Sequence, residues 1–258
     1  MQESKNIYFV SDAHLGAPDH KNSLKRERKL VDWLEQIAPN AGAIFLLGDI
    51  FDFWFEYKHV VPRGYTRLLG AIARITDQGI PVHFFAGNHD LWIKDYFTKE
   101  SGMHIHHQPL EMEVNNKKFY IAHGDGLGKG DTGYKLLKMI FTCKLCQWLF
   151  ARLHPNFAIG IARYFSSQSR LASNNEEHFE GEDNEFLILH AKELLKHRHI
   201  DYFIFGHRHL PLKVNIGEQS FYINLGEWFN QFTYGVFDGT EFHLQYFDKT
   251  GDPAVNNS

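Results

Sequence analysis

The sequence predicts an α/β fold built around a parallel β-sheet, and two observations lead to this prediction. Strand-like and helix-like segments alternate over the first part of the chain, which is the pattern of β-α-β units. Two such units in succession place their strands side by side and parallel in one sheet. The chain has 258 residues, of which 43% are hydrophobic, so it is long enough to bury a large core.

The elements of the N-terminal part follow this plan in order. We assign helices where apolar residues recur at a spacing of three and four, and strands where a short apolar run ends at a glycine or a polar residue. The predicted elements are a strand over 7–10, a helix over 23–38, a strand that ends at Gly48, a helix over 65–78 and a strand over 81–86.

The pattern changes after residue 104, where strands predominate. An Asn115-Asn116 turn between two alternating runs predicts a β-hairpin over 111–121. The remaining predicted elements are a helix over 185–196, strands over 201–205, 212–216, 220–225, 234–237 and 241–247, and a polar tail over 249–258.

A basic and strongly apolar helical segment at 134–172 interrupts this pattern. It contains six Lys or Arg residues and no Asp or Glu, although the whole chain has a formal charge of −4. Such a shift in composition indicates an inserted cap. We therefore expect a core over 1–130 and 184–248 and a helical cap insertion over 131–183, with residues 169–183 as a polar loop. The alternative is that these helices only pack on the core.

Five of the predicted strands end in residues that commonly bind metal ions. The carboxyl ends of parallel strands meet at one edge of a sheet, where ligands bind. Carboxylates and imidazoles that leave water need partners there, and together they suit hard or borderline cations. The candidate ligands are Asp12, His14, Asp49, Asn88, His123, His207 and His209.

Seven ligands are too many for one ion with an open coordination position. They favour two ions about 3.5–4 Å apart that share Asp49 and a water. Two such ions lower the pKa of that water and stabilise an in-line displacement at phosphorus. The mixture of His, Asp and Asn favours Mn²⁺, Fe or Zn²⁺ over Ca²⁺ or Mg²⁺. His89, next to Asn88, is the candidate for transition-state stabilisation or for protonation of the leaving oxygen, and Asp90 is expected to orient His89 or a ligand.

The ordered set of motifs closely resembles the calcineurin-like metallophosphoesterase superfamily over residues 7–247. The motifs are Asp12-x-His14, Gly48-Asp49, Gly87-Asn88-His89-Asp90, His123-Gly124-Asp125 and Gly206-His207-Arg208-His209. The resemblance implies a β-sandwich of two sheets flanked by helices, in which the C-terminal strands form the second sheet. It also implies two metal sites. These are formed by Asp12, His14, Asp49 and His209 and by Asp49, Asn88, His123 and His207.

Further motifs look like those of the UDP-2,3-diacylglucosamine hydrolases of lipid A synthesis. They lie at 11–16, 48–54, 100–103, 123–127 and 131–134. This resemblance implies hydrolysis of the pyrophosphate of UDP-2,3-diacylglucosamine to UMP and 2,3-diacylglucosamine 1-phosphate (lipid X), with two Mn²⁺ ions, at the cytoplasmic membrane face. It also implies substrate contacts from Asp131, Ser169 and Arg170. The chain departs from this group at His89, where many of these hydrolases have Arg.

Composition limits the partners of the chain. Its 31 acidic and 27 basic residues argue against a general nucleic-acid binder, and its two cysteines exclude a disulfide framework. The N-terminus lacks the features of a signal peptide, and no apolar stretch approaches the ~20 residues of a membrane span, so we expect a cytoplasmic protein. Segment 134–172 fits acyl chains and phosphate groups, and such a helix also lies on anionic lipid, which predicts peripheral contact with the inner membrane.

Two other hypotheses remain open from the sequence. The same metal site would also serve a phosphoesterase that acts on another diester, a nucleotide or a phosphoprotein. In the third hypothesis the chain is a metal-free scaffold of the same fold that binds partners through its apolar cap. The complete set of ligands argues against the scaffold.

Overall fold

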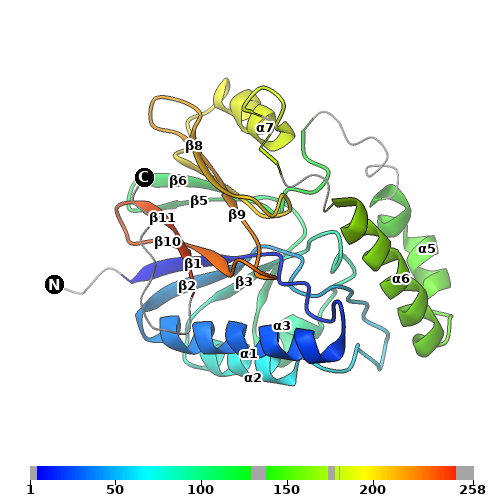
Figure 1. Cartoon of the computed structure of the whole chain (residues 1–258). Coiled ribbons are helices and arrows are strands. Elements are labelled where there is room, and N and C mark those ends of the chain that lie inside the picture. Colours follow the sequence, from blue (N-terminus) through cyan, green and yellow to red (C-terminus); the bar gives the residue numbers. More distant parts are fainter. Residues whose placement is uncertain (1–4, 129–137, 174–177, 180, 248–258) are drawn as a thin grey trace.

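The computed structural model is a sandwich of four layers, with two β-sheets between two layers of helices (Figure 1). The structure describes residues 5–128, 138–173, 178–179 and 181–247. Figure 1 shows helices α1, α2 and α3 along the outer face of one sheet and α7 over the outer face of the other. The predicted α/β class, with two sheets flanked by helices, is therefore confirmed.

The first sheet has six strands in the order β11-β10-β1-β2-β3-β4. Strands β1 to β4 are parallel, whereas β10 is antiparallel to β1 and β11 is antiparallel to β10. The strands are β1 (Asn6–Val10), β2 (Ala41–Leu46), β3 (Val82–Phe85), β4 (His104–His106), β10 (Thr233–Phe237) and β11 (Phe242–Tyr246). The crossover helices are α1 (His20–Ile37), followed by a 3₁₀ turn at Ala38–Asn40, α2 (Thr66–Asp77) and α3 (Tyr96–Ser101).

Both predicted β-α-β units are present, but the structure adds a third unit that the sequence analysis missed. Helix α3 has six residues and strand β4 has three. Neither is long enough to fill the window of about 11–18 residues in which a hydrophobic period becomes visible.

The second sheet has five strands in the order β5-β6-β7-β9-β8. Strands β5 and β6 form the predicted hairpin, and Asn115 and Asn116 at its turn have φ angles of 50° and 61°, as a type I′ turn requires. Strand β7 is parallel to both β6 and β9. The elements are β5 (Leu110–Val114), β6 (Lys117–Ile121), β7 (Tyr202–Phe205), β8 (Pro211–Asn215), β9 (Phe221–Leu225) and α7 (Phe186–Leu195).

Three layers of buried apolar side chains hold these elements together. The first packs helices on the first sheet and includes Trp33, the second lies between the sheets and includes Phe9 and Phe45, and the third packs α7 on the second sheet. Strands β1 and β7 have apolar layers on both faces, which explains their continuous apolar sequences. The two sheets are therefore held face to face.

Helices α5 (Lys144–Phe150) and α6 (Pro155–Ser173) lie beyond the carboxyl end of β1 (Figure 1). The indole N–H of Trp92 donates to the carbonyl oxygen of Phe141 (2.6 Å), and its ring packs on Phe150 with 4.7 Å between ring centroids. None of the helices in the described ranges is long and apolar enough to cross a membrane.

Only some of the predicted limits of the cap can be compared with the described residues of the structure. The expected polar loop over 169–183 is wrong for residues 169–173, because α6 continues through them. This last turn is rich in polar residues and carries no apolar period, so it resembled a loop in the sequence. The boundary at 131 lies outside the described residues, and the division into core and cap stays a prediction.

The N-terminus of α2 depends on a carboxylate from α1. Tyr65, which precedes α2, has a φ angle of 59°, and its side chain makes no capping hydrogen bond. The buried Glu27 instead accepts hydrogen bonds from the backbone N–H groups of Arg67 (3.0 Å) and Leu68 (3.2 Å).

We predict that Glu27→Ala lowers the free energy of unfolding by about 1–3 kcal/mol, because it leaves these N–H groups without their acceptor. Urea denaturation followed by circular dichroism measures the change. The matched control is Glu35→Ala on the same helix, where the ion pair with Arg74 is exposed and the cost should stay below about 1 kcal/mol. Equal losses in the two variants would contradict the capping role of Glu27.

Candidate metal centre

The strand ends of both sheets bring the predicted ligands together. Three groups of side chains have nitrogen or oxygen atoms that all lie within 4.8 Å of one another. These groups are Asp12–His14–His209, His14–Asp49–His89 and Asp49–His123–His207. The amide oxygen of Asn88 lies 3.2 Å from Nε2 of His123, so all seven candidate ligands are gathered at one place.

The backbone at this place is unusual. Nine non-glycine residues in the described part of the chain have a positive φ angle, and five of them are candidate ligands. Such conformations cost of order 1–3 kcal/mol each and persist only where the surroundings enforce them. The five are Asp12, His14, Asp49, His207 and His209. Backbone strain is therefore concentrated at the candidate centre.

Two glycines allow the loops to approach one another. A Cβ atom at Gly206 would lie 2.6 Å from Oδ2 of Asp12, and one at Gly87 would collide with Oδ1 of Asp49. The sequence suggested only that these glycines end strands and form turns. The structure shows that they also leave room for the carboxylates of the candidate ligands.

Hydrogen bonds to backbone groups orient the ligands. Nδ1 of His123 donates to the carbonyl oxygen of Leu47 (2.7 Å), which directs Nε2 toward Asp49, 3.5 Å from its Oδ2. The backbone N–H of His207 donates to Oδ2 of Asp12 (3.0 Å), and that of His89 donates to Oδ1 of Asp49 (2.9 Å).

Asp90 joins two of the loops. Its Oδ1 accepts from the N–H groups of Asp49 (3.2 Å) and Gly87 (2.8 Å), and its Oδ2 accepts from those of Ile50 (3.0 Å) and Phe51 (3.2 Å). The sequence analysis expected Asp90 to orient either His89 or a ligand. The hydrogen bond to the N–H of Asp49 matches the second of these roles. Burial and the nearby Asp49 carboxylate raise the pKa of Asp90 to about 7.

The charges of the centre are tightly coupled. Burial disfavours the charge on Asp49, but the imidazoles of His123 and His89 hold the pKa of this carboxyl well below its usual value. Burial and the neighbouring His123 lower the pKa of His207 to about 4, so this ring is neutral at pH 7 and offers a lone pair. Against the effect of burial, Asp49 raises the pKa of His123 to about 10. A cation bound by His123 would therefore displace a proton.

The donor set fits divalent metal ions. Nε2 of His209 lies 3.2 Å from Oδ1 of Asp12 and 3.3 Å from Nε2 of His14, and the side chains of Asp12 and His14 are buried. Buried carboxylate oxygens and neutral imidazole nitrogens that converge in this way suit transition-metal ions, because each needs a partner once it has left water.

His89 lies at the edge of this centre. Its Nε2 is 4.0 Å from Oδ2 of Asp49, and its ring stands edge-on to His14 with 4.7 Å between centroids. Its other nitrogen, Nδ1, lies 3.1 Å from the carbonyl oxygen of Asp52 and 2.9 Å from Oγ of Ser166. The sequence analysis did not find Ser166, because this contact depends on how α6 folds back onto the core.

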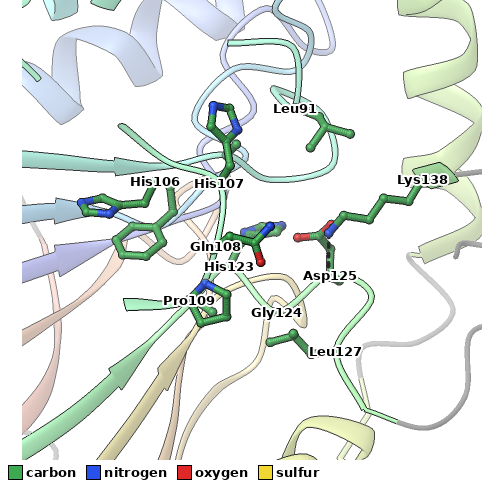
Figure 2. Close-up of a pocket in the computed structure, with 13 residues that line it drawn as sticks. Leu91, His106, His107, Gln108, Pro109, His123, Gly124, Asp125, Leu127 and Lys138 are labelled. Carbon is green, nitrogen blue, oxygen red and sulfur yellow. Dashed lines mark hydrogen bonds and ion pairs between the residues drawn. The ribbon is translucent and has the colours of Figure 1, made fainter. Parts of the chain in front are cut away.

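A pocket opens beside His123 (Figure 2). Figure 2 shows Lys138 and Asp125 pointing toward each other at one side of it, and Nζ of Lys138 donates to Oδ2 of Asp125 at 2.6 Å. His107 and Gln108 line the pocket as well. This arrangement places a cationic group of the basic segment close to the candidate metal centre.

The three predicted substrate contacts cannot be placed beside this pocket. Asp131 lies outside the described residues, as do the side chains of Ser169 and Arg170. The backbone of these last two residues belongs to α6.

Comparison with known proteins identifies the class to which this fold and centre belong. The sequence profile described as calcineurin-like phosphoesterase matches residues 5–211. The chain therefore belongs to the calcineurin-like phosphoesterase family.

Individual known proteins are similar to this chain over most of their length. The chain is 41% identical to a UDP-2,3-diacylglucosamine hydrolase from Porphyromonas gingivalis, with 93% of this chain and 96% of that protein covered. It is 30% identical to a protein of the same name from Aeromonas salmonicida, with 86% of each covered. A solved phosphoesterase from E. coli is 14% identical, with a TM-score of 0.47 and 97% of each chain covered.

We predict that Asp90→Asn weakens Mn²⁺ binding roughly 10–100-fold, because the new NH₂ group would face two backbone N–H donors and release the loop that carries Asp49. Isothermal titration calorimetry of the metal-free protein measures the affinity. Asp95→Ala is the matched control, since this exposed carboxylate pairs only with solvent-exposed Lys99 among the ion pairs of the described chain. An Asp90→Asn variant that folds normally and binds Mn²⁺ as tightly as the wild type would refute this role.

Proposed function

We propose that this protein is a dinuclear-metal phosphoesterase that hydrolyses the pyrophosphate of UDP-2,3-diacylglucosamine, giving UMP and 2,3-diacylglucosamine 1-phosphate in lipid A synthesis. The observation that carries the proposal is the 41% identity to a hydrolase of that name over 93% of this chain. The cluster of carboxylates and imidazoles at the strand ends supports the metal-dependent chemistry.

The proposed ligand sets follow the family resemblance, and two of the three groups of side chains support them. One ion would be held by Asp12, His14, Asp49 and His209, and the other by Asp49, Asn88, His123 and His207. Two bound divalent ions would neutralise phosphate charge and lower the pKa of a water between them. We propose Mn²⁺ for both positions, with Fe and Zn²⁺ as alternatives, because imidazoles suit these metals.

His89 is the proposed catalytic residue. Its Nε2 lies 4.0 Å from Oδ2 of Asp49, at the edge of the ligand cluster, which supports this role. An N–H at this nitrogen would donate to the leaving oxygen and stabilise the charge that develops there.

The proposed glycolipid site lies on the helices that follow residue 131, with contacts from Asp131, Ser169 and Arg170. Large apolar side chains of α5 and α6 are exposed, and Leu145, Trp148 and Leu149 have 63%, 53% and 54% of their surface open to solvent. The inner side of this segment packs on Trp92, so the exposed apolar side remains open to acyl chains or lipid. We therefore propose peripheral contact with the cytoplasmic face of the inner membrane.

One observation favours a second candidate function. His89 occupies the position at which many of the resembling hydrolases have Arg. A protein with the same metal centre but a different residue here could act on another phosphodiester.

We predict that the Mn²⁺-loaded protein releases UMP from UDP-2,3-diacylglucosamine, which chromatography of the products measures. Asp49→Ala should abolish turnover and weaken metal binding, because Asp49 is shared by both proposed sites. His89→Ala should lower kcat by roughly 10²–10⁴ while metal stays bound, as expected for a residue that acts on the leaving group.

The exposed His104 provides the control, and His104→Ala should change neither metal content nor kcat. Loss of metal from the His89→Ala variant would contradict its catalytic assignment. Wild-type protein that leaves UDP-2,3-diacylglucosamine intact but hydrolyses bis(p-nitrophenyl) phosphate would support the second candidate instead.

We predict that Leu149→Glu weakens binding to vesicles of phosphatidylglycerol and phosphatidylethanolamine by roughly tenfold or more, because it removes an exposed apolar side chain and adds a charge. Sedimentation with the vesicles measures the bound fraction. Leu189→Glu on α7, at a site that is 43% exposed, is the matched control and should bind as the wild type does. Equal binding by both variants would show that α5 does not contact lipid.

A further inference from the structure

A serine of α6 reaches the ring of His89. The hydroxyl of Ser166 lies 2.9 Å from Nδ1 of His89 and donates a hydrogen bond to the carbonyl oxygen of Asp52 at 3.0 Å. Whereas neighbouring Tyr164 and Phe165 have more than 60% of their surface exposed, Ser166 has only 8% exposed. The contact therefore joins α6 to His89 in the interior of the protein.

The two oxygens around Nδ1 require this nitrogen to carry a hydrogen. The carbonyl oxygen of Asp52, 3.1 Å from Nδ1, can only accept a hydrogen bond. Ser166 gives its hydrogen to that same carbonyl, so its own oxygen is left to accept from Nδ1. Both contacts are satisfied when Nδ1 carries the hydrogen. The partners of Nδ1 thus fix the orientation of the ring, whether or not Nε2 also carries a hydrogen.

This arrangement leaves Nε2 as the nitrogen that faces the ligand cluster, 4.0 Å from Oδ2 of Asp49. Rotation of the ring would move Nε2 away from this position and break both contacts of Nδ1. The two oxygens therefore hold Nε2 where the proposed hydrogen bond to the leaving oxygen would form.

We propose that Ser166 is a positioning residue for His89, an inference that rests on the proposed function because the role of His89 does. Ser166 belongs to the helix that also carries Ser169 and Arg170, about one turn further along the chain. A displacement of α6 from the core would move an acceptor of His89 together with the proposed substrate contacts. The position of α6 on the core and the orientation of His89 are therefore linked.

Steady-state kinetics of the full-length, Mn²⁺-loaded protein on bis(p-nitrophenyl) phosphate test this role. Ser166→Ala should lower kcat roughly three- to tenfold and change KM by less than about twofold, because it removes one orienting hydrogen bond and no substrate contact. Ser166→Thr keeps the hydroxyl and should restore most of kcat. Ser167→Ala is the matched control, since its hydroxyl donates to the carbonyl oxygen of Tyr164 in its own helix, and its kcat should equal that of the wild type.

The decisive comparison is made in the His89→Ala background, where Ser166→Ala should cause no further loss. A loss as large as in the wild-type background would show that Ser166 does not act through His89, and an unchanged kcat in the single variant would also overturn the inference. Absence of turnover by the wild type on every diester tested would refute the proposed function and not the contact itself.

A second measurement therefore tests the contact without activity. The measurement is the ¹⁵N-histidine spectrum of the Zn²⁺-loaded protein, in which the Nδ1–H signal of His89 is identified by its loss in His89→Ala. This signal should be sharp, and its hydrogen should exchange slowly with solvent. It should remain so in Ser166→Thr and broaden or vanish in Ser166→Ala. An identical signal in the wild type and in Ser166→Ala would overturn the inference.

Discussion

The structure depends on the burial of the Asp49 carboxylate between imidazoles from both sheets. Asp49 follows β2 of the first sheet, and His123, 3.5 Å away, follows β6 of the second. A buried carboxylate is costly unless opposite charge and hydrogen bonds surround it. Three features bring imidazoles and N–H groups to Asp49. They are the positive φ angles of the ligand residues, the glycines that leave room for the carboxylates, and the four N–H groups bound by Asp90. The sandwich therefore brings the strand ends of the two sheets together. Neither sheet alone supplies the full set of candidate ligands.

Much of this could be predicted from the sequence, because the information is local. Each ligand directly follows an apolar run, and parallel strands bring their carboxyl ends to one edge whatever the details of packing. The candidate ligands Asp12 and Asp49 could therefore be proposed without knowledge of the second sheet, which only the family resemblance supplied. The type I′ hairpin at Asn115-Asn116 was found for the same local reason.

The features that the sequence did not predict depend on tertiary contacts. The sequence analysis did not single out His106, which is half-buried with its Nε2 2.9 Å from Nδ1 of His83 on the neighbouring strand. Ser166 has no distinguishing sequence context, since it is one of several serines in α6, and only the docking of the helix separates it from Ser167. Short elements such as β4 were missed because a strand of three residues has no measurable period.

His89 contacts the buried Ser166 of α6, and an arginine at position 89 would not need the same contact. An arginine would bring a fixed charge and a planar fork of donors, and several of its hydrogen bonds could be made at once. An imidazole has only two nitrogens, and its usefulness depends on which one carries a hydrogen and which way the ring points. His89 therefore requires partners for Nδ1, and the structure provides one from the loop after β2, Asp52, and one from α6, Ser166. In this chain the helix that lines the proposed substrate site thus also supports the orientation of the residue proposed to act on the substrate.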